Sequence, residues 1–447
     1  MKAKWLPISA AVALALGSVS ASAVDFHGYF RAGTTYATQG GDAYCVGTGG
    51  SGHFLGRLAD ECDTYAELTL SQEVFNKNNN KFTVNTLVAY GTEEGNWDHQ
   101  GNTWQGENGG NGSAWDGQRL SLREAWAGYE MPSGIQLWAG KRYYQRKDIH
   151  IMDYYYLNNS GNGFGVENID TGLGAVSVAI IKHQTVFGGE AGDLDRNSWK
   201  LDARWSGIPL WTDGSLDIAM IYAWQNLSES QKKTEKANNG YLAMVEWTQG
   251  NFFGGFNKLS FTYGHDGLDG VAGNHAGDNV VPYSEKGNGF RFIDWGVIEQ
   301  PSWNLGYAFI WSHHNAFDEN ETEGGANWNG LTGTDFNFVL RPSYKWSDFT
   351  STVLEFGYYN FSNNYKYKVI DPDGNVIRPA SVMHGDHRMR ATKLTLAQQW
   401  TPGSQFWARP SIRVFASWLS GNAYDHFFDN ENDSHQITLG AQVEAWW

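Results

Sequence analysis

Short stretches in which apolar and polar side chains alternate recur along almost the whole chain. A period of two places alternate side chains on opposite faces of a strand, and about ten residues cross a bilayer as a tilted strand. We therefore expect many strands with one apolar and one polar face, although the fifth and sixth segments alternate only weakly. The eighteen segments are residues 25–34, 64–75, 81–92, 119–129, 135–142, 164–170, 174–183, 197–206, 214–225, 239–248, 257–265, 289–299, 303–313, 335–345, 350–361, 391–400, 405–418 and 434–447.

The connections between these segments alternate between short and long. The short ones contain turn residues, and are Asn76–Asn80, Pro132–Gly134, Ser206–Asp213 and Pro402–Gly403. The long ones are rich in Gly, Asn and Asp, and are Thr92–Gln118, Asp266–Asn288, Asn315–Thr334 and Asn363–Arg390. Short periplasmic turns and long extracellular loops are typical of outer-membrane barrels, and an open strand edge in lipid would leave backbone groups unpaired. The sequence thus predicts an all-β fold, a closed antiparallel transmembrane β-barrel of 18 strands. A secreted β-sandwich or β-helix would need a two-sided core, whereas here the second face of most strands is polar.

The first 23 residues predict export from the cytoplasm. Lys2 and Lys4 precede the apolar run LPISAAVALAL, and Ala21-Ser22-Ala23 follows as an A-x-A cleavage site. This arrangement is that of a secretory signal peptide. We expect a mature chain of residues 24–447, forming one barrel domain in the bacterial outer membrane.

Composition and charge exclude several other classes of function. Aromatic residues make up 15% of the chain and 54 residues are Gly, which suits a sheet with one face toward lipid. The formal net charge of −16 disfavours nucleic acid as a partner. Neither a nucleotide-binding nor a proton-coupling motif is visible, so we expect no cofactor. A barrel enzyme such as a phospholipase would need a Ser–His pair, and the strands do not suggest one.

Cys45 and Cys62 are the two cysteines of the chain. An even pair in an exported chain favours one disulfide that closes a local loop. The alternative, a metal site, lacks a clear set of partner ligands, so we expect no bound metal.

Large aromatic residues occur on the polar face of several strands. In the last segment, the odd-numbered residues from Ile437 to Trp447 form the apolar face, yet Trp446 falls on the polar face. An aromatic girdle should lie on the outer face, so parity argues against that explanation, although simple inward packing is an alternative. A sugar ring has an apolar C–H face, so we expect the inward aromatic residues to offer stacking sites, with neighbouring charged groups bonding the hydroxyls. The inward aromatic residues are Tyr29, Tyr65, Phe256, Trp407 and Trp446.

The stretch from Lys141 to Gly163 does not alternate and combines five tyrosines with charged residues. An ordinary exposed loop would rarely be so aromatic. We expect this stretch, which we call the third loop, to fold into the lumen, where such residues narrow the pore and fix its selectivity.

Several long motifs resemble the maltoporins, the trimeric eighteen-stranded sugar porins of bacterial outer membranes. The resemblance covers nearly the whole mature chain, while the long loops differ. It is strongest in Val24-DFHGYFRA-Gly33, Arg57-LADECDTYAE-Leu68, Trp138-AGKRYYQRKDIHIMDYY-Tyr156, Val166-ENI-Asp170, Gly255-FN-Lys258, Leu394-TLAQQ-Trp400, Phe406-WARPSIRVF-Ala416 and Gly440-AQVEAW-Trp447.

The resemblance implies a diffusive channel for maltose and maltodextrins. The family's line of aromatic residues, called the greasy slide, falls on the five residues that parity selects. A sixth member, from a neighbouring subunit, falls on Trp115, with Trp97 and Trp104 as alternatives. The constriction tyrosine falls on Tyr155, and the family's first-loop disulfide on Cys45 and Cys62. The implied polar track is Arg31, Arg57, Glu67, Arg123, Arg146, Asp148, His150 and Asp153. Asn158 departs from the family, which has an acidic residue there.

The implied partners are maltodextrins, outer-membrane lipid and two further copies of the chain. A periplasmic sugar-binding protein and bacteriophages are further candidates. Two alternatives stay open. A sucrose porin would carry a periplasmic coiled-coil segment before the barrel, and none precedes this one. A general porin would lack the inward aromatic row.

Overall fold

A computed structural model describes most of the barrel and parts of its loops. The described residues are 24–41, 43, 53–61, 64–92, 119–185, 196–229, 232, 239–268, 286–317, 321–323, 326–370, 376–421 and 435–447. The expected signal peptide lies outside this set, so its cleavage stays a prediction. Within the described part, no helix is long and apolar enough to cross a membrane.

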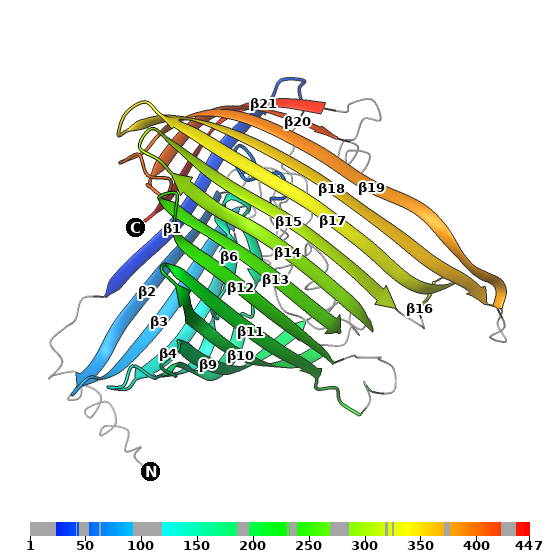
Figure 1. Cartoon of the computed structure of the whole chain (residues 1–447), viewed down its shortest axis with the longest axis horizontal. Helices are drawn as coiled ribbons and strands as arrows, with labels where there is room; N and C mark the ends of the chain where they lie inside the picture. Colours follow the sequence, from blue (N-terminus) through cyan, green and yellow to red (C-terminus); the bar gives the residue numbers. More distant parts are fainter. Residues whose placement is uncertain are drawn as a thin grey trace, which may run out of the picture.

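Eighteen antiparallel strands pair in sequence order around a closed sheet, which confirms the predicted barrel. Each pairs with the strand before it and the strand after it (Figure 1). They are β1 (Asp25–Ala37), β2 (Thr64–Lys77), β3 (Asn80–Thr92), β4 (Arg119–Glu130), β5 (Gln136–Arg142), β8 (Gly161–Asp170), β9 (Ala175–Thr185), β10 (Arg196–Trp211), β11 (Gly214–Gln225), β12 (Gly240–Phe252), β13 (Gly255–Asp266), β14 (Lys286–Glu299), β15 (Trp303–Phe317), β17 (Ala326–Lys345), β18 (Thr350–Ile370), β19 (Val376–Trp400), β20 (Ser411–Gly421) and β21 (His435–Trp446).

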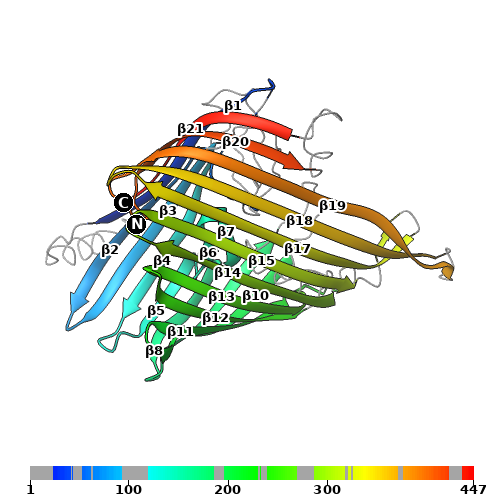
Figure 2. The same cartoon turned by 45° about the horizontal axis from the view of Figure 1, so that its top comes forward.

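The first and last strands close the barrel. β1 lies beside β21 in both views (Figures 1 and 2), and their register runs from Tyr29 opposite Trp446 to Ala37 opposite Thr438. This pairing leaves the sheet without a free edge, as the lipid environment requires. It also brings residues from opposite ends of the sequence into adjacent positions on the lumen wall.

Side-chain exposure follows the expected alternation. In β20, Ile412 is 53% exposed and Val414 46% exposed, whereas the intervening Arg413 is 5% exposed. Trp447 is 49% exposed and contacts Phe26 on the same outer face, with the ring centroids 5.6 Å apart. The outer face is therefore apolar and ready for lipid, as the strand parity predicts.

Two predicted long loops are shorter than the sequence suggested. β18 continues to Ile370 and β19 begins at Val376, with Tyr365 opposite Met383, so most of Asn363–Arg390 is an extended hairpin. Likewise, β15 and β17 extend into Asn315–Thr334 and enclose the short β16 (Glu321–Glu323). Both stretches contain the Gly, Asn and Asp residues that suggested loops, so their composition concealed the extension of the strands.

Two predicted short connections also differ. β10 continues to Trp211, so the turn in Ser206–Asp213 contains only residues 212 and 213. The connection at Pro402–Gly403 is longer and occupies residues 401–410. Pro410 has no N–H for a strand ladder, and β20 begins only at the next residue. The predicted strand at 405–418 is therefore wrong over its first six residues.

The inner wall is not polar throughout. Across β11 to β17 the inward side chains include Ile221, Leu242, Met244 and Ile310, all almost fully buried. An apolar patch facing a water-filled lumen would be unfavourable unless another part of the chain covers it. The covering segment is the third loop.

Candidate functional site

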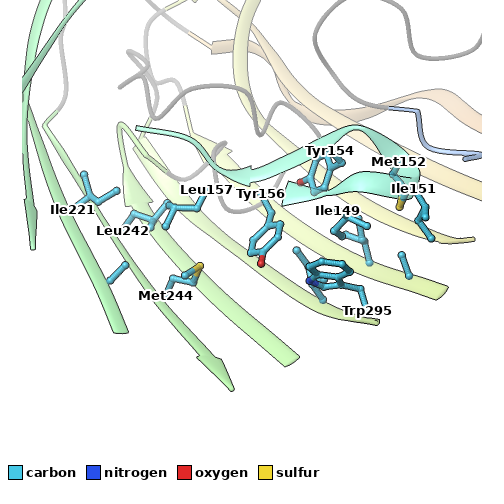
Figure 3. Close-up of a cluster of buried hydrophobic side chains, with 14 of the residues drawn as sticks. Ile149, Ile151, Met152, Tyr154, Tyr156, Leu157, Ile221, Leu242, Met244 and Trp295 are labelled. Atoms are coloured by element: carbon cyan, nitrogen blue, oxygen red, sulfur yellow. The ribbon is translucent and has the colours of Figure 1, made fainter. Parts of the chain in front are cut away.

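The third loop folds into the lumen, as the sequence predicted. It lies between β5 and β8 and contains β6 (Lys147–Ile149), the 3₁₀ turn η2 (His150–Met152) and β7 (Tyr154–Leu157). Figure 3 shows the loop above the wall strands, with Ile149, Tyr156 and Leu157 placed between them. Burial of this apolar face holds the loop against one side of the barrel and leaves its polar face toward the lumen.

Ionic and hydrogen-bonded contacts fix the loop at several points. Lys147 Nζ lies 2.7 Å from both Asp217 Oδ2 and Glu246 Oε1. The Tyr156 hydroxyl donates to Glu246 Oε2 at 2.5 Å, and Asn159 Nδ2 donates to Asp202 Oδ2 at 2.9 Å. Because Glu246 is fully buried, these contacts exclude water from its carboxylate and restrict the loop to one position.

Residues 53–61 also enter the lumen, which the sequence did not predict. We call them the inner segment of the first loop. Leu55 is fully buried, and Leu58, Arg57 and Asp60 are no more than 3% exposed. The backbone N–H of Arg57 donates to the carbonyl of Ile151 at 3.0 Å, so this segment contacts the third loop directly.

Three of the predicted aromatic residues lie on adjacent strands. Tyr65 is on β2, Tyr29 on β1 and Trp446 on β21, and Tyr29 is directly opposite Trp446 in the ladder. The Tyr29 and Tyr65 ring centroids are 6.2 Å apart. The guanidinium of Arg31 lies 5.1 Å from the centre of the Tyr65 ring. Three of the predicted aromatic residues therefore occupy neighbouring positions on three adjacent strands.

Trp407 reaches the same region from the 401–410 connection. It is not on a strand, so its predicted inward parity rested on a wrong secondary-structure assignment. Its ring nevertheless lies 5.4 Å from that of His150, which is 5.3 Å from the ring of Trp446. The imidazole thus lies between the two tryptophans.

Phe256 occupies the start of β13, near the short turn at residues 253–254. Its ring contacts Trp295 edge to face at 5.0 Å and packs against the apolar cluster beneath the third loop. Phe256 is therefore anchored on the short-turn side of the barrel. Tyr65 is at the start of β2, on the long-loop side.

Glu444 is the centre of a dense ionic network. Its carboxylate lies 3.2 Å from Arg57 Nη1, 3.1 Å from His150 Nε2 and 2.7 Å from Arg409 Nη2. Arg409 also covers the Trp446 ring at 4.2 Å. One carboxylate therefore joins the first loop, the third loop and the 401–410 connection beside the aromatic residues.

The network favours one tautomer of His150. Arg57 Nη1, which can only donate, lies 3.1 Å from His150 Nδ1, whereas Nε2 lies 3.1 Å from the acceptor Glu444 Oε1 and 3.3 Å from the donor Arg409 Nη2. Glu444 is the acceptor beside the ring, so we assign the proton to Nε2. Burial, together with the neighbouring Arg57 and Arg409, lowers the pKa of His150. The ring is therefore neutral at pH 7.

Arg31 joins the first and third loops. Its guanidinium lies 2.8 Å from Glu61 and 2.7 Å from Asp153. Burial alone would raise the pKa of Asp153, but Arg57 and Arg31 hold it well below its usual value. Asp153 also adopts a left-handed backbone, with φ of 46°, where η2 ends. Its charged side chain thus fixes a sharp turn.

Tyr155 belongs to a stack of rings and a cation. The Arg146 guanidinium lies 3.5 Å from the Tyr143 ring centre and 4.6 Å from that of Tyr155. Tyr155 pairs with Asp148 in the β6–β7 ladder, and burial raises the pKa of the Asp148 carboxyl. On the wall side of this stack lies a polar cavity of about 300 Å³, lined partly by Arg146, Lys258 and Trp295.

Glu67 and Arg123 complete the described polar set. Glu67 Oε1 accepts from the hydroxyls of Tyr65 at 2.6 Å and Tyr143 at 3.4 Å. Arg123, on β4, interacts electrostatically with Tyr143. Asn158, where an acidic residue was expected, is buried and accepts from the Ser160 hydroxyl at 2.5 Å.

The structure thus places Tyr65, Tyr29, Trp446 and Trp407 near one another with most of the predicted polar residues, whereas Phe256 lies apart on the short-turn side. Cys45, Cys62, Trp115, Trp97 and Trp104 lie outside the described residues, so the disulfide and the sixth aromatic member stay predictions. Sequence reasoning did not select Glu444 as a site residue. Its parity signal was present, because it precedes Trp446 by two positions on the same face.

Comparison with known proteins agrees with this geometry. The family model described as LamB porin matches residues 24–447. A maltoporin of Photobacterium profundum is 32% identical, covering 99% of this chain and 98% of its own, and one of Vibrio cholerae is 34% identical, covering 98% of each. Among solved structures, OpdK of Pseudomonas aeruginosa is 8% identical, with a TM-score of 0.48 over 95% of this chain and 99% of that one. That likeness is too distant to bear on function.

Proposed function

We propose that this chain, which belongs to the LamB porin family, moves maltodextrins across the outer membrane along the inward aromatic residues. The chain is an outer-membrane sugar channel and not an enzyme. The single observation that supports the finer proposal is a row of aromatic residues flanked by charged groups: the Tyr65 and Tyr29 rings are neighbours, Tyr29 is opposite Trp446 in the ladder, and the Trp446 and Trp407 rings both contact His150.

The chemistry of the path suits a glucose polymer. Each glucose ring has an apolar C–H face that can stack on an aromatic ring, and a rim of hydroxyls. The Arg31 side chain lies beside the aromatic rings and can donate to those hydroxyls, while Asp153 and Glu67 can accept. The side chains of Arg57 and Arg409 are only 4% and 2% exposed, and they hold the Tyr29 hydroxyl and the Trp446 ring from behind. Each of these charged groups already has an ionic or hydrogen-bonded partner in the protein, so a sugar hydroxyl replaces water without leaving a buried charge unpaired.

Several moderate sites in series favour passage over tight retention. Each stacking contact contributes about 0.5–1.5 kcal/mol, and a chain bound at several of them can advance by exchanging one ring for the next. Conduction requires binding strong enough for entry and weak enough for release. The third loop, with Tyr155 and Arg146, narrows the path so that a sugar must pass along the rings.

The resemblance also supports a homotrimer in which Trp115 of one subunit reaches the entrance of the next. Trp97 and Trp104 remain alternatives for this role. The same chemistry favours a channel for maltodextrins over a general porin, because opposed charges alone would not offer apolar stacking surfaces. Sucrose is the nearest alternative substrate.

Flux into liposomes tests the proposal. Purified protein is reconstituted into liposomes, and entry of maltose, maltohexaose and sucrose is followed under equal gradients. We expect maltohexaose entry that saturates with concentration and stops when the two sides are equal, because no energy source is coupled. Accumulation against a gradient, or entry that falls only with molecular size, would contradict the proposal.

A further inference from the structure

The inner segment of the first loop, residues 53–61, lies between the barrel wall and the third loop. Its Leu55 and Leu58 side chains are buried, and Leu58 packs with Val353 and Phe415 of the wall. A connecting segment normally stays at the surface because its backbone groups need hydrogen-bond partners. The question is which residues supply those partners here.

Lys393, on β19, supplies two of them. Its Nζ donates to the carbonyl of Leu58 at 2.9 Å and to that of Gly56. The same amine lies 3.4 Å from Glu355 Oε1 and 3.9 Å from Asp60 Oδ2. Lys393 is only 2% exposed, so its charge is neutralised by this cluster and is withdrawn from the lumen.

Glu355, on β18, binds the segment from the other side. Its Oε1 accepts from the backbone N–H of Leu58 at 3.0 Å, and Arg341 holds the same carboxylate at 2.5 Å. Glu355 is fully buried. Both backbone polar groups of Leu58 are thus hydrogen-bonded to the wall, its N–H to Glu355 and its carbonyl to Lys393.

Gly357 allows the close approach. A Cβ at this position would lie 2.0 Å from the carbonyl oxygen of Leu55, a separation that real atoms do not adopt. Gly357 is directly opposite Lys393 in the β18–β19 ladder. The wall therefore lacks a side chain at Gly357, where the Leu55 backbone approaches, and carries the Lys393 ammonium group beside it to bind the segment's carbonyl groups.

The opposite face of the segment carries Arg57 to the sugar path. Arg57 Nη2 donates to the Tyr29 hydroxyl at 2.5 Å, and Nη1 lies 3.2 Å from Glu444. The backbone N–H of His53 donates to the carbonyl of Met152 at 2.5 Å. Displacement of the segment would consequently move Arg57 and release the third loop where η2 ends.

We propose that Lys393, Glu355 and Gly357 are positioning residues that set maltodextrin affinity through the inner segment of the first loop, without contacting the sugar. The inference rests on the function proposed above. Its distinguishing feature is that three buried wall residues control the position of Arg57, whose guanidinium holds the Tyr29 hydroxyl and Glu444 beside the sugar path. A role in barrel stability alone would change assembly and leave the affinity of assembled channels unaltered.

The test uses planar bilayers and block of the ion current by maltohexaose. Gly357→Ala and Lys393→Met are compared with the wild type and with Gly250→Ala, a β12 change whose added Cβ meets nothing closer than 3.4 Å. We expect each wall variant to weaken maltohexaose affinity about tenfold, equivalent to about 1.4 kcal/mol, with a noisier open-channel current. Gly250→Ala should match the wild type.

A double-mutant cycle with Arg57→Met separates positioning from independent effects. If Lys393 acts through Arg57, the double variant should bind maltohexaose as weakly as Arg57→Met alone. Should Lys393→Met fail to assemble, Gly357→Ala decides, because it removes no ionic group. Wild-type affinity in assembled wall variants, or additive losses in the cycle, would overturn the inference. Wild-type channels that maltohexaose does not block would instead remove the proposed function.

Discussion

Replacement of Trp446 by alanine should weaken sugar binding without damaging the pore. Trp446 lies on the inner face of β21, opposite Tyr29. Its ring contacts the imidazole of His150 and the guanidinium of Arg409. The substitution removes one stacking surface, worth about 0.5–1.5 kcal/mol. Since about 1.4 kcal/mol is a factor of ten, the dissociation constant for maltohexaose should rise about two- to twelvefold.

The neighbouring polar groups should keep their positions in this variant. Arg409 loses a cation–π contact of about 0.5–1 kcal/mol, but its ion pair with Glu444 at 2.7 Å remains. Glu444 also keeps Arg57 and His150. The loss of affinity therefore reports stacking and not a collapse of the charged network. Open-channel conductance should stay equal or rise, because the third loop is unchanged.

The assay is maltohexaose block of single-channel current, with Trp447→Ala as the matched control. Trp447 is the next residue but lies on the outer face, 49% exposed and packed against Phe26 and Phe30. Its replacement should reduce membrane assembly and leave the affinity of assembled channels at the wild-type value. Unchanged affinity in correctly assembled Trp446→Ala channels would refute the stacking argument.

Three further expectations follow from the same contacts. Lys147→Met leaves the fully buried Glu246 without its closest cation, a loss of about 3–5 kcal/mol for a buried pair, so the third loop should loosen; single-channel records should show higher conductance and more noise, and an unchanged record would count against the anchor. Because burial lowers the pKa of His150, its ring should gain a proton only below the usual value of about 6.5 and become neutral again as the pH rises through the lowered value. Maltohexaose affinity should therefore be constant above about pH 6.5 and fall in more acidic buffer, with a smaller fall in His150→Gln. A decline that begins at neutral pH would exclude this assignment. If Cys45 and Cys62 form the predicted disulfide, a thiol reagent should not label folded, unreduced protein, and labelling of either cysteine would disprove the bond.

Strand parity predicted the parts of the site that lie on regular strands. Tyr29, Tyr65 and Trp446 alternate with apolar neighbours that face lipid, so their inward direction follows from a period of two. The same reasoning placed Trp407 inward for the wrong reason. β20 begins only after Pro410, so Trp407 precedes the strand. It lies in the irregular 401–410 connection, which carries it inward.

Contacts between distant segments could not be predicted from local patterns. Ile221 and Met244 face the lumen although they are apolar, because the third loop covers them. Residues 53–61 have no periodic signal, since their burial depends on Lys393 and Glu355, more than 290 positions away in the sequence. The motif resemblance supplied Arg57 as a polar-track residue, but it did not indicate that its whole segment is buried.

The most direct test of the sugar path is titration of the ion current with maltohexaose in planar bilayers. Stepwise additions of the sugar should block the wild-type current with saturation, and maltose should block it more weakly because it spans fewer rings of the path. Sucrose should be weaker than maltohexaose at equal concentration. A current that maltohexaose leaves unchanged, or reduces only in proportion to solution viscosity, would contradict the assignment of a maltodextrin path to this lumen.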